Sequence, residues 1–202
     1  MMSLFPTVLH EFEVPTFKQV QEDLIKQVYK ERKKDPVGRQ MTNVGGWQSQ
    51  EWGGWHSQGK EFDRNILSEF IIKEVSNYFT QNKILKSGTQ LHFSNWWINI
   101  NKKGDFNEKH VHPASHLSGV CYLQVPLNSG TIVFDSPHLF TRCRETSFYN
   151  PVLADSFKII PALVVTGSPG KFLIFPSDLL HGVEPSKSRE DRISLSFNIN
   201  LT

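Results

Sequence analysis

The sequence has little of what marks several protein classes. Its 202 residues include only two cysteines, Cys121 and Cys143, too few for the disulfide framework of a small secreted domain. No uninterrupted apolar run approaches the roughly 20 residues that cross a bilayer. The first residues also lack the charged and apolar regions of a secretory signal. We therefore expect a soluble, cytoplasmic protein that does not enter a membrane.

Charge of one sign is scarce as well. The chain carries 22 Lys and Arg against 20 Asp and Glu, a net charge of +2. Its densest basic cluster, Lys30–Asp35, is typical of a solvated helix end, so nucleic-acid binding has little electrostatic support. The chain is still long enough to bury a sizeable core. We expect one domain over residues 1–202.

Two helical patterns precede a long β region. Apolar residues at helical spacing follow Thr16, which forms a capping-box pattern with Gln19, and a second such run follows Asp63. From Leu91 onward short strands alternate with turns, beginning with Leu91–Asn101 and interrupted by an irregular stretch, residues 138–155. The pattern predicts helical support over about 1–85 and a β core over about 90–202. This is a mainly β fold with flanking helices, arranged as a sandwich or jelly roll.

The histidines suggest a metal site. His110 and His112 are two residues apart, so on a strand both imidazoles point to one face. Neutral imidazole is a good ligand for transition metals. His181, far along the chain, offers a third ligand, and three protein ligands leave positions open for a substrate and dioxygen or water. His116 is a spare histidine of the same cluster.

An arginine lies at the start of the last strand. Arg192 and Ser194 share a strand face, eleven residues beyond His181. A guanidinium can hold a carboxylate through two parallel hydrogen bonds, and the serine hydroxyl can add a third. A metal beside such an arginine suits a dicarboxylic 2-oxoacid, because one end chelates the metal and the other pairs with the arginine.

Four segments carry a family resemblance: HVHPASHLSGVCYLQVP, SGTIVFDSP, GKFLIFPSDLLHGVEPS and DRISLSFNIN. They resemble the 2-oxoglutarate and Fe(II)-dependent oxygenase superfamily. More narrowly, they are similar to an oxygenase family of bacteria and bacteriophages that also has an upstream GGW segment, here Gly45–Trp47. The resemblance covers most of the chain from Asn43 to the end. It implies a double-stranded β-helix (jelly-roll, cupin-like) core that uses Fe(II), 2-oxoglutarate and O2. The implied reaction is decarboxylation of 2-oxoglutarate to succinate, coupled to hydroxylation of an unidentified substrate.

The ligand pattern departs from the superfamily's usual H-x-D/E…H. Two residues after His110 stands His112 where a carboxylate is usual. We favour an iron site of three histidines, His110, His112 and His181. Two alternatives stay open. In the first, His112 begins an H-x-A pattern with no carboxylate. In the second, Asp105 or Glu108 supplies the anion.

Strand placement and one unusual loop add further candidates. Tyr122 and Asn99 are placed to hydrogen-bond 2-oxoglutarate. The segment Asn43–Gly59 is rich in glycine and tryptophan, and it either braces the body with buried indoles or overhangs the metal as a substrate loop. We expect a substrate loop whose candidate residues are Trp47, Trp52 and Trp55.

Two other functions remain compatible with these residues. A cupin-like metal enzyme that does not use 2-oxoglutarate would share the histidines but would not require Arg192 and Ser194. A non-catalytic β-sandwich module would bind a partner through the tryptophan loop. As partners we expect an unidentified small molecule or protein side chain, with no nucleic acid and no membrane, and the sequence leaves room for a homodimer.

Overall fold

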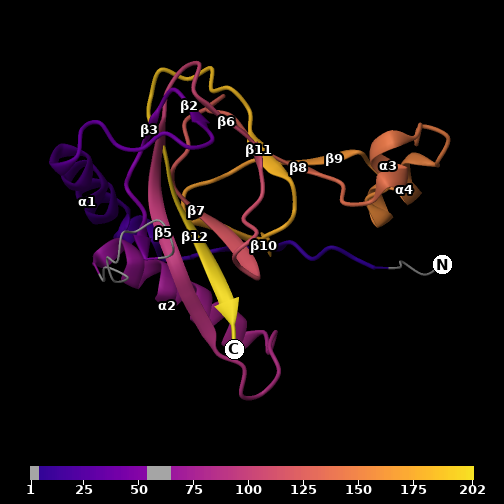
Figure 1. Cartoon of the computed structure of the whole chain (residues 1–202), viewed down its shortest axis with the longest axis horizontal. Helices are drawn as coiled ribbons and strands as arrows, with labels where there is room; N and C mark the ends of the chain where they lie inside the picture. Colours follow the sequence, from indigo (N-terminus) through magenta and orange to yellow (C-terminus); the bar gives the residue numbers. More distant parts are fainter. Residues whose placement is uncertain (1–4, 54–64) are drawn as a thin grey trace.

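Two antiparallel β-sheets form the body of the protein in the computed structural model, which describes residues 5–53 and 65–202 (Figure 1). Within these residues the larger sheet has the order β1-β10-β7-β12-β5-β3, and β4 also pairs with β5. Its strands are β1 (His10–Glu13), β3 (Trp47–Gln48), β4 (Trp52–Gly53), β5 (Leu91–Asn101), β7 (Leu117–Gln124), β10 (Lys171–Pro176) and β12 (Arg192–Leu201). The smaller sheet has the order β2-β6-β11-β8-β9. It contains β2 (Asn43–Val44), β6 (Phe106–His110), β8 (Ile132–Asp135), β9 (Ala162–Val165) and β11 (His181–Val183).

The path of the chain between the sheets is that of a jelly roll. From β5 onward, strands β5, β7, β10 and β12 lie in the larger sheet, while β6, β8, β9 and β11 lie in the smaller one. All neighbouring strands are antiparallel. The predicted jelly-roll core with flanking helices is therefore confirmed. Such closure buries one face of each sheet and leaves an interior that side chains or a ligand can fill.

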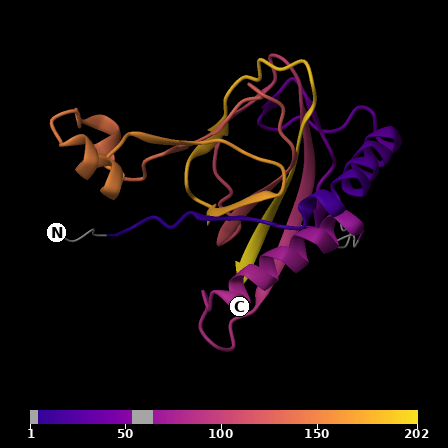
Figure 2. The same cartoon turned by 180° about the vertical axis from the view of Figure 1, so that it is seen from behind.

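The helices cover one face of the larger sheet. A short 3-10 turn, η1 (Phe17–Gln19), leads into α1 (Gln21–Lys34), and α2 (Ile66–Gln81) follows. Figures 1 and 2 show α1 and α2 on the same side of this sheet. Their buried residues join those of β5 and β12 in one cluster that includes Leu24, Val28, Leu67, Val75, Trp96, Ile98 and Phe197. Trp96 and Ile98 therefore lie on the face of β5 that packs against the helices. The opposite face is left for the cavity.

Both helix starts differ in detail from the prediction. Thr16 makes no side-chain cap, because the chain first forms η1, and α1 begins only after Val20. The second helix is capped by Asn65, whose side chain accepts hydrogen bonds from the backbone N–H groups of Leu67 and Ser68. The Ser68 hydroxyl in turn accepts from the Asn65 N–H. The predicted cap, Asp63, lies outside the described residues.

The stretch predicted to be irregular, residues 138–155, contains two short helices instead. They are α3 (Leu139–Cys143) and α4 (Pro151–Phe157), which lie between β8 and β9 and stand away from the sheets (Figure 1). Asn150 caps α4 and Pro151 is its first residue. This is a favourable helix start that the sequence-based prediction did not include. No helix of the described ranges combines the length and apolar character that crossing a bilayer requires.

The packing of α2 predicts a large effect from one truncation. Leu67→Ala removes a fully buried side chain from the helix–sheet core. We expect the free energy of unfolding to fall by about 2–5 kcal/mol, since both transfer energy and cavity formation contribute. Chemical denaturation measures this change. Leu139→Ala, at a leucine 66% exposed on α3, is the matched control and should change stability by less than about 0.5 kcal/mol. Equal losses in the two variants would contradict the described core.

Candidate metal centre

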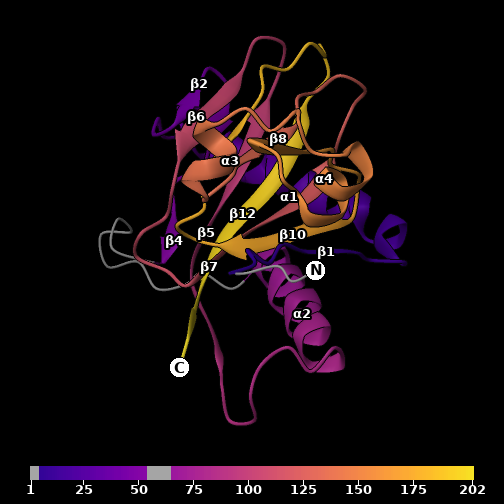
Figure 3. The same ribbon diagram turned by 90° about the vertical axis from the view of Figure 1, so that its right-hand side faces the viewer.

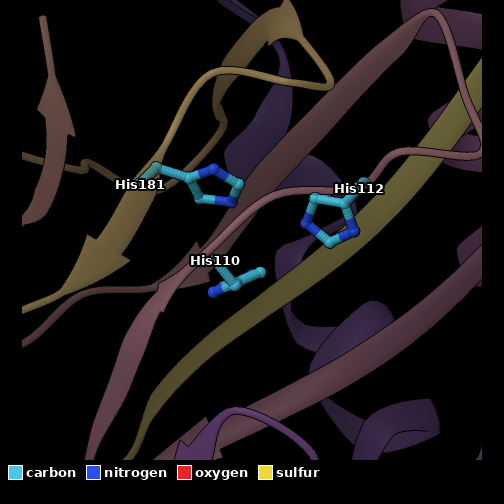
Figure 4. Close-up of side chains that lie close together, drawn as sticks. All are labelled: His110, His112 and His181. Carbon is cyan, nitrogen blue, oxygen red and sulfur yellow. The ribbon is translucent and has the colours of Figure 1, made fainter.

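Three histidines converge where the smaller sheet faces the cavity. His110 is the last residue of β6 and pairs directly with His181, the first residue of β11. The ring centroids of these two lie 4.5 Å apart, and His112 lies 4.9 Å from His110 and 5.2 Å from His181. One nitrogen of each ring lies within 4.8 Å of those of the other two. Figure 4 shows the three rings turned toward one another. The group can therefore hold one metal ion.

His112 reaches the group differently from the prediction. The strand ends at His110, so His110 and His112 do not lie on one strand. The backbone N–H of His112 instead donates to the carbonyl of Ser177 at 2.7 Å. This contact fixes the segment after β6 and brings the second imidazole to the same point.

Hydrogen bonds and burial prepare these rings as ligands. Nδ1 of His110 lies 2.7 Å from the carbonyl oxygen of Glu108, and Nδ1 of His181 lies 2.8 Å from that of Leu179. A carbonyl only accepts, so in each ring Nδ1 carries the proton and Nε2 keeps its lone pair. Burial, with repulsion between the imidazolium forms, lowers the pKa of His112 to about 3. Burial first, and His110 second, lowers the pKa of His181 to about 4.

The pKa of the third imidazole, that of His110, is lowered as well. Burial lowers the pKa of His110, and its hydrogen bond to the Glu108 carbonyl opposes the shift. All three imidazoles are thus neutral near pH 7. Metal ligation requires this form, so binding there would not have to displace protons.

The alternative ligands lie elsewhere. The carboxylate of Asp105 accepts from the backbone N–H of Lys102, and the side chain of Glu108 is exposed. Nδ1 of His116 contacts Asn200 rather than the other histidines. Over residues 5–53 and 65–202, the group of metal-binding side chains contains three histidines and no carboxylate.

A buried arginine opens on the same cavity. Arg192 is only 3% exposed, and its guanidinium lies 5.0 Å from the centroid of the Tyr122 ring. In the described part of the chain, neither Arg192 Nε nor Tyr122 Oη has a hydrogen-bond partner of normal geometry. Burial raises the pKa of Tyr122, and the nearby guanidinium opposes this shift. An uncompensated buried cation is costly, so this place suits the anionic group of a ligand.

The residue before Arg192 anchors it. The Asp191 carbonyl accepts a hydrogen bond from Gln124 Nε2 at 2.7 Å, and the Asp191 carboxylate accepts one from Tyr29 Oη at 2.6 Å. These contacts tie the start of β12 to β7 and to α1. The position of the guanidinium is therefore set by the packed body and not by a loop.

The remaining predicted cosubstrate residues lie beside Arg192. Ser194 is opposite Asn99 on β5 and opposite Tyr122 on β7. Nδ2 of Asn99 donates to Ser196 Oγ at 3.0 Å. All four predicted residues and the three histidines line one cavity of about 890 Å³ between the sheets. The volume falls within the usual range for a small-molecule site.

Two of the three tryptophans of this segment do not lie where the prediction put them. Trp47 is buried in the helix–sheet core, and its Nε1 donates to the Asp35 carbonyl at 2.9 Å. Trp52 stacks on Trp96 with ring centroids 4.3 Å apart. Neither indole lines the cavity, so for these two the substrate-loop prediction is wrong and the brace is correct. Trp55 lies outside the described residues.

Polar neighbours of these tryptophans line the cavity instead. Gln48 and Glu51 face it from the loop, and Asn95 and Asn198 face it from β5 and β12. The sequence-based prediction did not include these residues, because it selected the tryptophans of the segment. Alternation in short extended segments was the available signal, since Gln48 points away from the side on which Trp47 is buried.

Comparison with known proteins gives one family match and several structural matches for this chain. A family model described as "Putative 2OG-Fe(II) oxygenase" matches residues 95–198. No curated protein matches the sequence. Among solved structures, a Pseudomonas putida prolyl-4-hydroxylase aligns with TM-score 0.61 and 14% identity, over 95% of this chain and 91% of its own.

Two further structures show how widely the fold is shared. A viral collagen prolyl hydroxylase of Paramecium bursaria Chlorella virus-1 aligns with TM-score 0.55 and 14% identity, over 95% of this chain and 94% of its own. An alpha-ketoglutarate-dependent carbocyclase of nogalamycin biosynthesis aligns with TM-score 0.63 and 12% identity, over 96% and 79%. At these identities the likeness shows a common fold, and hydroxylases and a carbocyclase share it.

The position of Trp52 predicts a stability effect without a cavity effect. Trp52→Ala removes the ring that stacks on Trp96. Because the indole is only partly buried, we expect a loss of about 3 kcal/mol or less, the low end for a truncated tryptophan. Metal affinity should not change. Thermal melting and metal titration measure the two properties. Phe148→Ala, at an aromatic residue 86% exposed, controls for loss of an aromatic ring alone. Slower substrate-coupled succinate release by a Trp52→Ala protein of normal stability and normal metal binding would restore the substrate-loop interpretation.

Proposed function

Because the chain belongs to the 2-oxoglutarate and Fe(II)-dependent oxygenase family, we propose that His110, His112 and His181 bind its iron and that Arg192 binds its 2-oxoglutarate. The protein is a 2-oxoglutarate-dependent Fe(II) dioxygenase that uses O2. One observation carries the residue assignment. Three neutral imidazoles line the same cavity as a buried arginine that has no anionic partner among the described residues.

The donor set fits iron. Imidazole nitrogen is a common ligand of Fe(II), and three protein ligands leave coordination positions free. When bound, Fe(II) supplies the redox chemistry that couples decarboxylation of 2-oxoglutarate to oxidation of a second substrate. Phe175 and Trp97 pack against the histidines, with ring centroids 4.7 Å from His181 and 5.6 Å from His112. These rings hold the ligands in place and exclude water around them.

A ligand set without a carboxylate has an electrostatic consequence. Three neutral histidines do not offset the two positive charges of the ion. With the distal carboxylate of 2-oxoglutarate paired with Arg192, the carboxylate at the chelating end would offset one of these two charges. We infer that metal and cosubstrate stabilise each other's binding more here than at a site with a protein carboxylate, because opposite charges attract strongly in a poorly solvated cavity.

Each of the proposed cosubstrate residues has its own role in binding 2-oxoglutarate. Arg192 donates to the distal carboxylate, and its planar guanidinium allows two parallel hydrogen bonds. The Tyr122 hydroxyl and the Ser194 hydroxyl add donors from the neighbouring strand and from β12 itself. Asn99, on the other side of Ser194, completes this end of the cavity.

The same features favour this function over the two alternatives. A cupin-like metal enzyme without 2-oxoglutarate would not need a buried, unpaired Arg192 facing the cavity. A binding module that works through its tryptophans would expose them, whereas Trp47 and Trp52 pack on the core. We propose hydroxylation of a small molecule or a protein side chain as the coupled reaction. The related structures include hydroxylases, such as the prolyl-4-hydroxylase of Pseudomonas putida.

The metal assignment predicts that His181→Ala abolishes stoichiometric Fe(II) binding. The loss should exceed the roughly 10- to 100-fold effect of changing a residue that only supports a ligand. Anaerobic titration with Fe(II) measures it. In the unchanged protein, 2-oxoglutarate added to the Fe(II) form should produce a weak visible charge-transfer band, and O2 should then yield succinate.

The matched control is His116→Ala, which removes a histidine from the same sequence cluster that contacts Asn200 instead of the metal group. It should keep iron, the band and succinate formation. Full iron occupancy in His181→Ala would refute the ligand set. Absence of 2-oxoglutarate-dependent succinate from the unchanged protein across a substrate panel would count against the activity itself.

The cosubstrate assignment predicts a specific effect of Arg192→Lys. Lysine keeps the charge but loses the planar pair of donors. The affinity for 2-oxoglutarate should fall by roughly 1.5–3 kcal/mol, about 10- to 150-fold in Kd, with Fe(II) binding intact. Calorimetric titration of 2-oxoglutarate into the anaerobic Fe(II) protein checks this. Arg189→Lys, at an exposed arginine three residues earlier, should change nothing, and an unaltered Kd in Arg192→Lys would assign that arginine another role.

A further inference from the structure

The floor of the cavity consists of parallel rows of side chains that cross β7, β12 and β5. These strands lie side by side in Figure 3. The first row is Tyr122, Ser194 and Asn99, at the cosubstrate end. The next row, two residues further along β12, includes Trp97, whose ring lies 5.6 Å from that of His112. The rows therefore follow the order cosubstrate, then metal.

A third row continues beyond the metal. It consists of Ser118 on β7, Asn198 on β12 and Asn95 on β5, which are direct neighbours in the sheet, and we call it the polar row. Each of the three is less than a tenth exposed, and each lines the cavity. Asn198 is four residues from Ser194, about 13 Å along an extended strand. The polar row is therefore out of reach of a ligand group held by Arg192.

Hydrogen bonds give the polar row a fixed direction. The Ser118 hydroxyl donates to Asn198 Oδ1 at 2.7 Å, and Asn198 Nδ2 donates to Asn95 Oδ1 at 2.9 Å. Asn95 Nδ2 then donates to the carboxylate of Glu51. That carboxylate pairs with Arg39 at 3.1 Å. Both amides are thus held in one orientation, with their oxygens toward Ser118 and their NH2 groups toward Glu51.

In this fixed orientation, some hydrogen-bond donors and acceptors of the polar row remain available to a ligand. An amide NH2 has two N–H groups, and within the described residues Asn95 and Asn198 each use one of them. The second N–H of each amide is therefore available. Asn198 Oδ1 and Ser118 Oγ offer further lone pairs, whereas Asn95 Oδ1 already accepts from Asn198 Nδ2 and Ser94 Oγ. Glu51 and Arg39 neutralise each other, so the wall carries no net charge. The polar row would therefore recognise a ligand through hydrogen-bond donors and acceptors and not through charge.

We propose that the polar row binds the primary substrate through a neutral group that both accepts and donates hydrogen bonds, as an amide or a vicinal diol does. The inference rests on the proposed function, because it takes the Arg192 end as the cosubstrate site. A carboxylate would meet Glu51, and an ammonium would meet Arg39, so either charged group is disfavoured. The row lies across the metal from the cosubstrate, where a second substrate must enter.

Fragment binding tests this assignment. The anaerobic Fe(II) protein with 2-oxoglutarate is titrated with four probes of similar size: N-acetylglycinamide, cis-1,2-cyclopentanediol, butyrate and butylamine. Ligand-observed NMR gives each Kd. The amide or the diol should bind at least about tenfold more tightly than either charged probe, the scale of one or two hydrogen bonds. Which of the two binds distinguishes an amide from a diol substrate.

Two variants connect the result to named residues. Asn198→Ala should weaken the neutral probe about tenfold while the Kd of 2-oxoglutarate stays within about twofold. Glu51→Gln leaves Arg39 without its anion, so the affinity for butyrate should rise about tenfold and approach that of the neutral probes. Asn82→Ala, which removes an exposed amide bonded to the Tyr78 carbonyl at the end of α2, is the matched control and should change neither. The effect of Glu51→Gln on butyrate is a gain, so loss of folding cannot imitate it.

Four results would overturn the proposal: no binding of either neutral probe, preference for a charged probe, an unchanged neutral probe in Asn198→Ala, or no gain of butyrate in Glu51→Gln. Affinities of the unchanged protein for Fe(II) and 2-oxoglutarate are measured in the same samples. Their absence would refute the proposed metal and cosubstrate roles. The probe data would still decide on the polar row, so the two failures are distinguishable.

Discussion

The hydrogen-bond register of β12 between β5 and β7 is the constraint on which the cavity depends. Because β12 is paired on both sides, its cavity-facing residues Ser194, Ser196 and Asn198 each have one fixed neighbour on each strand. A shift by one residue would turn Ser194 and Asn198 into the helix–sheet core and bring apolar residues such as Leu195 into the cavity. The apolar face of β12, which packs under α1 and α2, prevents that shift. The helices contribute no residue to the metal group, yet they fix the sheet that forms its floor.

The cavity concentrates groups that a folding core would exclude. The buried histidines with lowered pKa cost free energy, and so do the Arg192 Nε and the Tyr122 hydroxyl, which have no partner among the described residues. The fold tolerates these groups because the other face of the larger sheet is apolar and packs against the helices. Binding a cation at the histidines and a dianion at the arginine would satisfy these groups together. The unfavourable features of the ligand-free site are therefore what would make its ligands bind.

Much of this arrangement could be predicted from local pattern. The β-forming run Leu91–Asn101 predicted β5 with the bounds that the structure shows. The histidines and Arg192 were recognisable because few residue types bind metals or carboxylates. The tryptophans misled the prediction for a related reason. A large aromatic residue is equally suited to a core and to a pocket wall, and only its neighbours decide. Alternation along β12 places Asn198 on the same face as Ser194. The role of Asn198 and Glu51, however, depends on a chain of hydrogen bonds between segments distant in sequence.

The sequence by itself determined the chemistry that this protein can perform: imidazoles for a metal, a guanidinium for a carboxylate, and alternating strands able to close into a jelly roll. These properties follow from side-chain type and from spacing along one segment. Only the tertiary structure decided which groups meet. His112 joins the metal group from beyond the end of its strand, Trp47 and Trp52 turn into the core, and Asn95 and Asn198 align across a strand pair. Such meetings depend on pairing and packing between residues up to about a hundred positions apart, which no local pattern encodes.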